Sequence, residues 1–287
     1  MQFTKMHGLG NCYLFVDCFG RMVGDAPALA RAMSDRNTGV GSDGLILLYP
    51  SQAADARMEI YNLDGSRAQM CGNGIRCAAK YLYEHGLARS NPMGIETDAG
   101  VLVVDLYLDG PVVEAARVDM GVPRFNPEDL PVQLSAEQMI DRPIRVRDHD
   151  ATMTCLSMGN PHAVIFGVPL DVLRGDGGAE GGLLAVEGRR IETDPLFPER
   201  VNVHFVQVQG AEEVTVLTWE RGSGATQACG TGAAAVCVAG ALTGRTSRSV
   251  TAHLPGGRLW LEWNASNDHV FMTGPAVEIF TGDWPTD

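Results

Sequence analysis

Lysine is nearly absent from this chain of 287 residues, which has only Lys5 and Lys80. Pyridoxal phosphate is held through a lysine Schiff base, so this scarcity argues against that cofactor. Positive charge is scarce overall, because 22 Lys and Arg residues face 35 Asp and Glu residues, for a net charge of −13. Nucleic acid is bound by clusters of basic side chains, so we expect no nucleic-acid partner.

Long apolar runs and a signal-peptide pattern are also missing. No run reaches the roughly 18 residues of a membrane helix, and the first ten residues lack a charged region followed by an apolar one. We therefore expect a cytoplasmic protein without a membrane partner. The 45% hydrophobic and 20% charged residues are typical of a globular chain with one large or two smaller domains.

Closely spaced cysteine pairs are absent too, since no two cysteines have the C-x-x-C spacing of zinc and redox sites. An odd number of cysteines without a signal peptide does not indicate a disulfide framework. Each cysteine must therefore be judged from its own surroundings. The seven are Cys12, Cys18, Cys71, Cys77, Cys155, Cys229 and Cys237.

The sequence contains an internal duplication. The run Gln-Met-Cys-Gly-Asn-Gly at 69–74 matches Gln-Ala-Cys-Gly-Thr-Gly at 227–232, 158 positions later. Each run opens an alanine-rich stretch that favours a helix, at 75–87 and 233–242. Upstream, each half also has a Gly-Asn pair before an apolar strand-like run. The repeated order of two elements predicts two homologous domains.

The remaining signal is mostly β. Residues 101–108 and 112–114 flank an Asp-Gly-Pro turn and predict two paired strands. Residues 201–205, 214–219 and 259–263 predict further strands, and 175–182 predicts a surface loop.

A cysteine that precedes Gly-Asn-Gly or Gly-Thr-Gly at a helix start is suited to acid–base chemistry. The helix N-terminus carries roughly half a positive charge, which favours a thiolate and predicts a lowered thiol pKa. The open N–H groups of the first turn can hold a carboxylate. Two such cysteines, one on each side of an amino acid, could remove a proton from one face of the α-carbon and deliver another to the opposite face.

The motifs resemble those of the diaminopimelate epimerase family. Asn62-x-Asp64-Gly65-Ser66-x-x-x-x-Cys71-Gly72-Asn73-Gly74-x-Arg76 resembles the family signature, and 220–232 is similar to its second cysteine motif. Residues 5–11, 158–162 and 197–203 are similar to further family blocks, so the resemblance covers essentially the whole chain.

The resemblance implies an α+β fold of two pseudo-symmetric domains, each a curved, mostly antiparallel sheet wrapped around a central helix. The expected domains are 1–117, to which 275–287 returns, and 118–274. It also implies an isomerase that interconverts LL- and meso-2,6-diaminopimelate by two-base proton transfer for lysine and peptidoglycan precursor biosynthesis. No cofactor or metal is implied, and a homodimer is expected.

The resemblance also assigns roles to particular residues. Cys71 and Cys229 would be catalytic, and His162 and Glu220 would modulate the thiol pKa values. The substrate would be bound by Asn11, Asn62, Gly72, Asn73, Asn160, Asn202, Glu220, Arg221, Gly230 and Thr231. The sequence departs from the family pattern at Cys12, Gly44 and Asp194, none of which touches the cysteine pair.

Three alternatives stay open at this point. The first is a proline racemase relative, which shares the two-cysteine logic but whose usual pattern differs around Asn73 and Glu220. The second is a non-catalytic thiol protein that uses the two cysteines as a redox switch. The third is a dinucleotide site at Gly39-x-Gly41-x-x-Gly44, although the strand-like run that follows stands where the phosphate site needs a helix. His204 and the other isolated histidines show no catalytic constellation.

Overall fold

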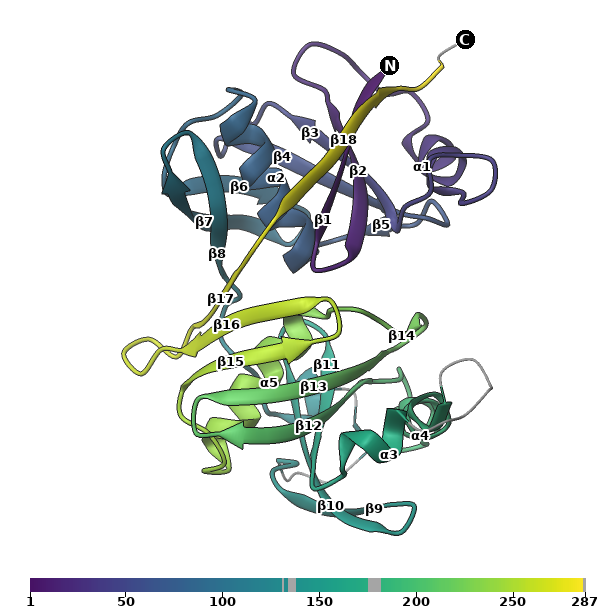
Figure 1. The fold of residues 1–287 in the computed structure, drawn as a ribbon, viewed down its shortest axis with the longest axis vertical. Helices are drawn as coiled ribbons and strands as arrows, with labels where there is room; N and C mark the ends of the chain where they lie inside the picture. The colour runs from purple at the N-terminus through teal and green to yellow at the C-terminus, as the bar shows by residue number, and fades with distance from the viewer. Residues whose placement is uncertain (131, 134–137, 175–181, 286–287) are drawn as a thin grey trace. The chain divides into compact units, whose positions relative to one another are not determined.

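The computed structural model describes residues 1–130, 132–133, 138–174 and 182–285, and the chain forms two compact units (Figure 1). Unit 1 comprises Met1–Asp119 and Thr273–Asp287, and unit 2 comprises Met120–Met272. The C-terminal segment therefore belongs with the N-terminal half of the chain. Most of the predicted surface loop, residues 175–181, lies outside the described residues.

Unit 1 is a mixed sheet with one central helix. In space the strands run β18-β1-β2-β3-β4-β6-β7-β8, with β5 on β4. Among these pairings of described residues, β2–β3 and β4–β6 are parallel and the others are antiparallel. The elements are β1 (Gln2–Gly8), β2 (Asn11–Asp17), α1 (Ala26–Ser34), β3 (Gly44–Tyr49), β4 (Ala56–Asn62), β5 (Arg67–Ala68), α2 (Gly72–Glu84), β6 (Met93–Thr97), β7 (Gly100–Asp109), β8 (Val112–Asp119) and β18 (Val277–Asp283).

Unit 2 repeats this plan. Its strands run β9-β10-β11-β12-β13-β15-β16, with β14 on β13. In the part of this unit that the structure describes, these pairings are parallel at β11–β12 and β13–β15 and antiparallel elsewhere. Strand β18 of unit 1 thus takes the place that β9 has in unit 2. The elements are η1 (Pro127–Asp129), β9 (Arg142–Val146), β10 (His149–Ser157), β11 (Pro161–Phe166), α3 (Leu170–Arg174), α4 (Gly182–Glu192), β12 (Asn202–Gly210), β13 (Glu213–Glu220), β14 (Gly224–Ala225), α5 (Gly230–Leu242), β15 (Ser249–Leu254), β16 (Gly257–Trp263) and β17 (Val270–Gly274).

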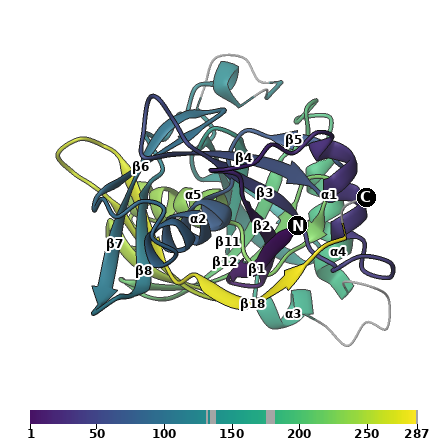
Figure 2. The same ribbon diagram turned by 90° about the horizontal axis from the view of Figure 1, so that it is seen from above.

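Each sheet packs around one helix, as the ribbon in Figure 2 also shows for α2 among the strands of unit 1. Helix α2 contacts β1, β2, β6, β7, β8 and β18, and α5 contacts β10, β11, β12, β15 and β16. Helix α5 is apolar on every side and is buried along almost its whole length, as expected for a helix inside a core. The predicted α+β class with two pseudo-symmetric domains is confirmed.

The predicted elements also appear where expected. Both principal helices begin directly after the cysteines, three residues before the alanine-rich stretches, because the Gly-Asn-Gly and Gly-Thr-Gly residues form their first turns. Gly44 opens strand β3 rather than a helix, so the dinucleotide alternative is wrong. Helices α1, α3 and α4 were not predicted.

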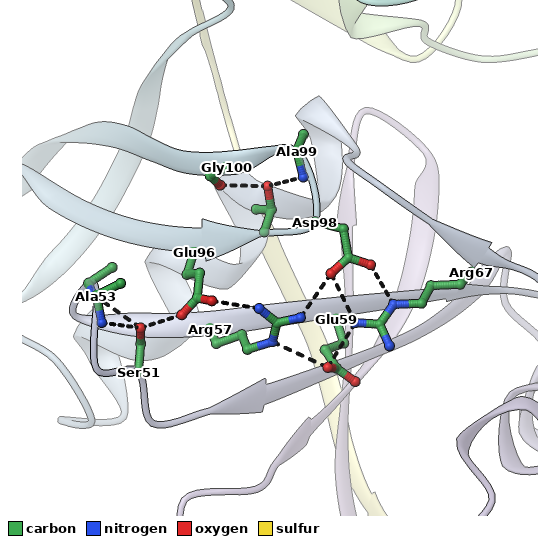
Figure 3. Close-up of polar contacts among 11 residues, drawn as sticks. Ser51, Ala53, Arg57, Glu59, Arg67, Glu96, Asp98, Ala99 and Gly100 are labelled. Atoms are coloured by element: carbon green, nitrogen blue, oxygen red, sulfur yellow. Dashed lines mark hydrogen bonds and ion pairs between the residues drawn. The ribbon is translucent and has the colours of Figure 1, made fainter.

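Strands β4 and β5 and the β6–β7 turn are joined by an ion-pair network (Figure 3). Arg57 pairs with Glu96 at 2.6 Å and with Asp98 at 2.9 Å. Arg67 also contacts Asp98, and both arginines reach Glu59. The network fixes β4 and β5, which lead into the Cys71 segment.

Candidate active site

Cys71 is the N-cap residue of α2. Its backbone is extended, with φ −143° and ψ 114°, and the Gly74 N–H lies 3.4 Å from its Sγ. A Cβ at Gly74 would lie 2.9 Å from Cδ1 of Ile46, so glycine lets the helix start pack onto strand β3. The sulfur therefore lies at the positive end of the helix.

Asn11 orients its amide toward this cysteine. Its Nδ2 donates to the Asp43 carboxylate at 3.0 Å, which leaves Oδ1 facing α2. That oxygen accepts from the Cys71 thiol at 3.5 Å and from Nδ2 of Asn73 at 3.4 Å. Asn73 is in turn held by the buried Arg76, whose guanidinium donates to Asn73 Oδ1 at 2.9 Å and to the Gly72 carbonyl at 3.0 Å.

Tyr13 is a further neighbour of Cys71 that the sequence did not indicate. Its buried hydroxyl hydrogen-bonds with the Cys71 and Asn11 side chains, and burial, followed by the Cys71 thiol, raises the pKa of Tyr13 well above its usual value. A Cβ at Gly44 would lie 2.9 Å from Cε1 of the Tyr13 ring and 2.3 Å from the Tyr61 carbonyl. Gly44 therefore makes room for the Tyr13 ring beside the cysteine.

Cys229 is the corresponding N-cap residue of α5, with φ −117° and ψ 109°. The prediction of a lowered thiol pKa is wrong for this residue, because burial and then the Glu220 carboxylate raise its pKa well above the usual value. The Thr231 hydroxyl, 3.6 Å from Sγ, lowers the pKa of Cys229, but by less than burial and Glu220 raise it. Here the cost of removing a thiolate from water exceeds the stabilisation that the helix N-terminus gives to its charge.

Glu220 acts on the Cys229 thiol, and the next residue, Arg221, bonds to Asn202. Glu220 ends β13 and accepts from the Thr226 hydroxyl at 2.6 Å. Asn202 donates to the Pro161 carbonyl at 3.0 Å and accepts from the Arg221 N–H at 3.1 Å. Its side chain therefore links the start of β11 to the end of β13.

His162 is fully buried on β11 and lies between Asn160 and a second buried histidine, His204. Its Nε2 is 2.9 Å from Asn160 Oδ1, and its Nδ1 is 2.9 Å from His204 Nε2. Burial, the neighbouring His204 and Arg221 lower the pKa of His162 well below its ordinary value. Burial lowers the pKa of His204 to about 3, so both rings are neutral at physiological pH.

The structure thus gathers the predicted residues into two groups, one within each unit. In unit 1, Asn11 contacts both Cys71 and Asn73, whereas Asn62 ends β4 and bonds to the Ser66 hydroxyl at 3.0 Å. Gly72 and Gly230 open the two helices. The sequence missed Tyr13 and His204, whose roles depend on neighbours from other strands.

Within the described ranges, no group of three His, Cys, Asp or Glu side chains is arranged to hold a metal ion. Among the helices of the same residues, none has both the length and the apolar character to cross a membrane.

Comparisons with known proteins agree with this geometry. A family model described as diaminopimelate epimerase matches residues 3–126 and 154–279. A diaminopimelate epimerase of Moorella thermoacetica is 49% identical over 288 residues and covers 100% of both chains, and one of Pelotomaculum thermopropionicum is 47% identical, covering 99% of each.

Solved structures share the fold at lower identity. A PhzF-family phenazine biosynthesis protein of Bacillus anthracis has a TM-score of 0.72 at 16% identity, covering 100% of this chain and 99% of its own. A probable proline racemase of Agrobacterium radiobacter has a TM-score of 0.67 at 16% identity, covering 100% and 93%. At such identity these two show the fold alone. The family model and the relatives that match over the full length show that this chain belongs to the diaminopimelate epimerase family.

Proposed function

We propose that this chain interconverts LL- and meso-2,6-diaminopimelate, with Cys71 and Cys229 as the two acid–base residues. The observation that carries the proposal is the repeated placement of a cysteine at the N-cap of the central helix of each unit. Membership of the family makes the chain an isomerase. We propose that units 1 and 2 are its two epimerase domains, with the substrate α-carbon between the thiols.

The raised pKa of Cys229 supports a division of labour between the two sulfurs. The raised pKa of Cys229 keeps its sulfur a thiol, which can donate a proton to one face of the α-carbon. Cys71 would be the thiolate that removes the proton from the L centre, next to the Tyr13 hydroxyl and the Gly74 N–H. In the reverse direction the two residues exchange roles, and Cys229 takes the proton from the D centre of the meso form.

The carboxylate of the reacting centre would bind to the first turns of the two helices. Their open N–H groups and helix dipoles stabilise the negative charge that develops when the proton leaves. The backbone N–H groups that would bind the carboxylate are those of Gly72, Asn73, Gly230 and Thr231.

The second amino-acid head of diaminopimelate needs both an anion and a cation partner. We propose that Arg221 binds its carboxylate and Glu220 its ammonium group. Further polar contacts would come from Asn11, Asn62, Asn160 and Asn202, while His162 and Glu220 tune the thiols. The reaction would supply lysine and peptidoglycan precursors in the cytoplasm, and the chain would act as a homodimer.

The test is proton exchange in heavy water without added cofactor. The chain should introduce deuterium at an α-carbon of LL-diaminopimelate while it forms the meso isomer. Cys71→Ala and Cys229→Ala should each lose epimerisation, because inversion needs a donor and an acceptor on opposite faces. Cys12→Ala is the matched control, since the Cys12 thiol donates to the Gly10 carbonyl at 3.5 Å and should be dispensable. Retention of full activity by either of the first two variants would refute the proposal.

A further inference from the structure

We propose that His204 is a positioning residue which, together with Thr218, determines which end of the Asn160 amide faces the substrate. The inference rests on the proposed function in one respect, namely that Asn160 binds diaminopimelate. The geometry that leads to it is a row of three hydrogen bonds within unit 2.

The row crosses three neighbouring strands. Thr218 Oγ1 on β13 lies 3.0 Å from His204 Nδ1 on β12. His204 Nε2 lies 2.9 Å from His162 Nδ1 on β11, and His162 Nε2 lies 2.9 Å from Asn160 Oδ1. Thr218 and His204 are directly paired across β12 and β13, so the sheet fixes the first link. The side chains of Thr218, His204 and His162 are buried.

Hydrogen-bond chemistry gives the row a direction. A neutral imidazole has one N–H donor and one acceptor nitrogen, and an amide oxygen only accepts. With Asn160 Oδ1 as acceptor, His162 must carry its proton on Nε2, and its Nδ1 must accept. His204 must then also carry its proton on Nε2, and its Nδ1 accepts from the Thr218 hydroxyl.

The two tautomers are therefore linked to each other and to the Asn160 side chain. Turning that amide around would require His162 and His204 to move their protons to Nδ1, and Thr218 to accept. In the observed arrangement Oδ1 is held by His162, so the amino group Nδ2 is the end offered to a ligand. A carboxylate has only acceptors, so this orientation suits an anionic group of the substrate.

His204 is also held by the helix that carries Cys229. A Cβ at Gly232, in the first turn of α5, would lie 2.1 Å from His204 Cε1. The close packing prevents the imidazole from tilting out of the row. It also explains why glycine stands at this position of the cysteine motif.

The direct test is ¹⁵N NMR of the ligand-free chain with labelled histidine at neutral pH, which reports the protonated nitrogen of each ring. We expect His162 and His204 both to carry the proton on Nε2. Two Nδ1-protonated rings, two different tautomers, or a charged ring would each overturn the inference.

Thr218→Val removes only the hydroxyl donor at nearly constant shape. We expect the single tautomer of His204 and His162 to be lost, and KM for diaminopimelate to rise by about tenfold with kcat within about twofold. Thr215→Val, on the same strand, is the control and should change neither, because Thr215 bonds to Gln209 outside the row. An unchanged tautomer pattern or KM in Thr218→Val would contradict the role of this residue.

His204→Gln tests the role of the ring itself, because a glutamine amide keeps one donor and one acceptor. We expect KM close to that of the wild type, whereas His204→Leu should raise it as Thr218→Val does. Equal loss in both variants would indicate a packing role and overturn the inference. If the tautomers are as expected but the wild type exchanges no α-proton, the proposed function fails and the direction of the hydrogen bonds still holds.

Discussion

Tyr13 and His204 lie next to predicted site residues and change how those residues can act. The Tyr13 hydroxyl hydrogen-bonds with the Cys71 thiol, and burial keeps that hydroxyl protonated and able to donate. His204 plays the comparable part for His162 in unit 2. In both units, therefore, a predicted site residue has a polar neighbour from another element that the sequence did not indicate.

Tyr13→Phe should make Cys71 less reactive, since a hydrogen bond donated to a sulfur anion stabilises the thiolate. We expect alkylation of Cys71 by iodoacetamide at pH 7 to slow by about tenfold, as measured by mass spectrometry of the Cys71 peptide. Tyr83→Phe serves as the control, because Tyr83, in the last turn of α2, packs against Arg89 at the opposite end of the helix from Cys71. Equal alkylation rates in wild type and Tyr13→Phe would show that the hydroxyl does not act on the thiolate.

Sequence alone could indicate Cys71 and Cys229 because their local context repeats within a few residues. It could not indicate Tyr13 or His204, since each becomes relevant only through a partner far along the chain. The prediction that the helix terminus lowers the pKa of Cys229 was wrong for a related reason. Burial and Glu220 are tertiary features, and together they outweigh a local dipole.

At the scale of secondary structure, the strands were predictable where apolar runs lie between turn residues. The pair at β7 and β8 is the clearest case, and both central helices followed from their alanine-rich stretches. Helix α1 was missed, although Asp25 caps it through the Ala28 N–H and Pro27 stands in its first turn. Its nine residues are too few to give a strong periodic signal.

The ion-pair network of Figure 3 should contribute to the stability of unit 1. Hydrogen bonds from Arg67, followed by the attraction of both arginines, lower the pKa of Asp98. A carboxyl group with a lowered folded-state pKa stabilises the fold above its unfolded pKa of about 3.9, and that contribution is lost as the pH falls through the lower folded value.

Asp98→Asn should therefore reduce the free energy of unfolding at pH 7 by about 1 kcal/mol. The effect is small because the network is partly exposed to solvent, which screens its charges. The difference from wild type should shrink as the pH falls below the unfolded pKa of about 3.9 and through the lower folded-state pKa of Asp98. Urea unfolding at several pH values measures both effects. Asp109→Asn, at the exposed end of β7, is the control, and a difference that does not depend on pH would exclude the charge as the cause.

At the scale of the whole molecule, the duplication seen in the sequence corresponds to two sheets with the same strand order and the same two parallel pairs. The sequence revealed the repeat through its glycine and cysteine motifs, whose residue types are set by close packing. The return of residues 275–287 to the first domain was expected only through the family resemblance. The residues themselves could not reveal that β18 fills the place of β9, because strand pairing depends on partners and not on local pattern.

The proposed mechanism requires two thiols, one from each unit, to approach the same carbon atom. With no substrate bound, thiols that meet in this way can be oxidised to a disulfide, provided that their Cα atoms come within about 7 Å. We expect mild oxidation of the ligand-free chain to abolish epimerase activity by joining Cys71 to Cys229, and dithiothreitol to restore it. Peptide mapping identifies the bridge, and bound substrate should protect against it. Cys229→Ser should form no such bridge, and an oxidised, inactive chain in which both thiols remain free would contradict the shared site.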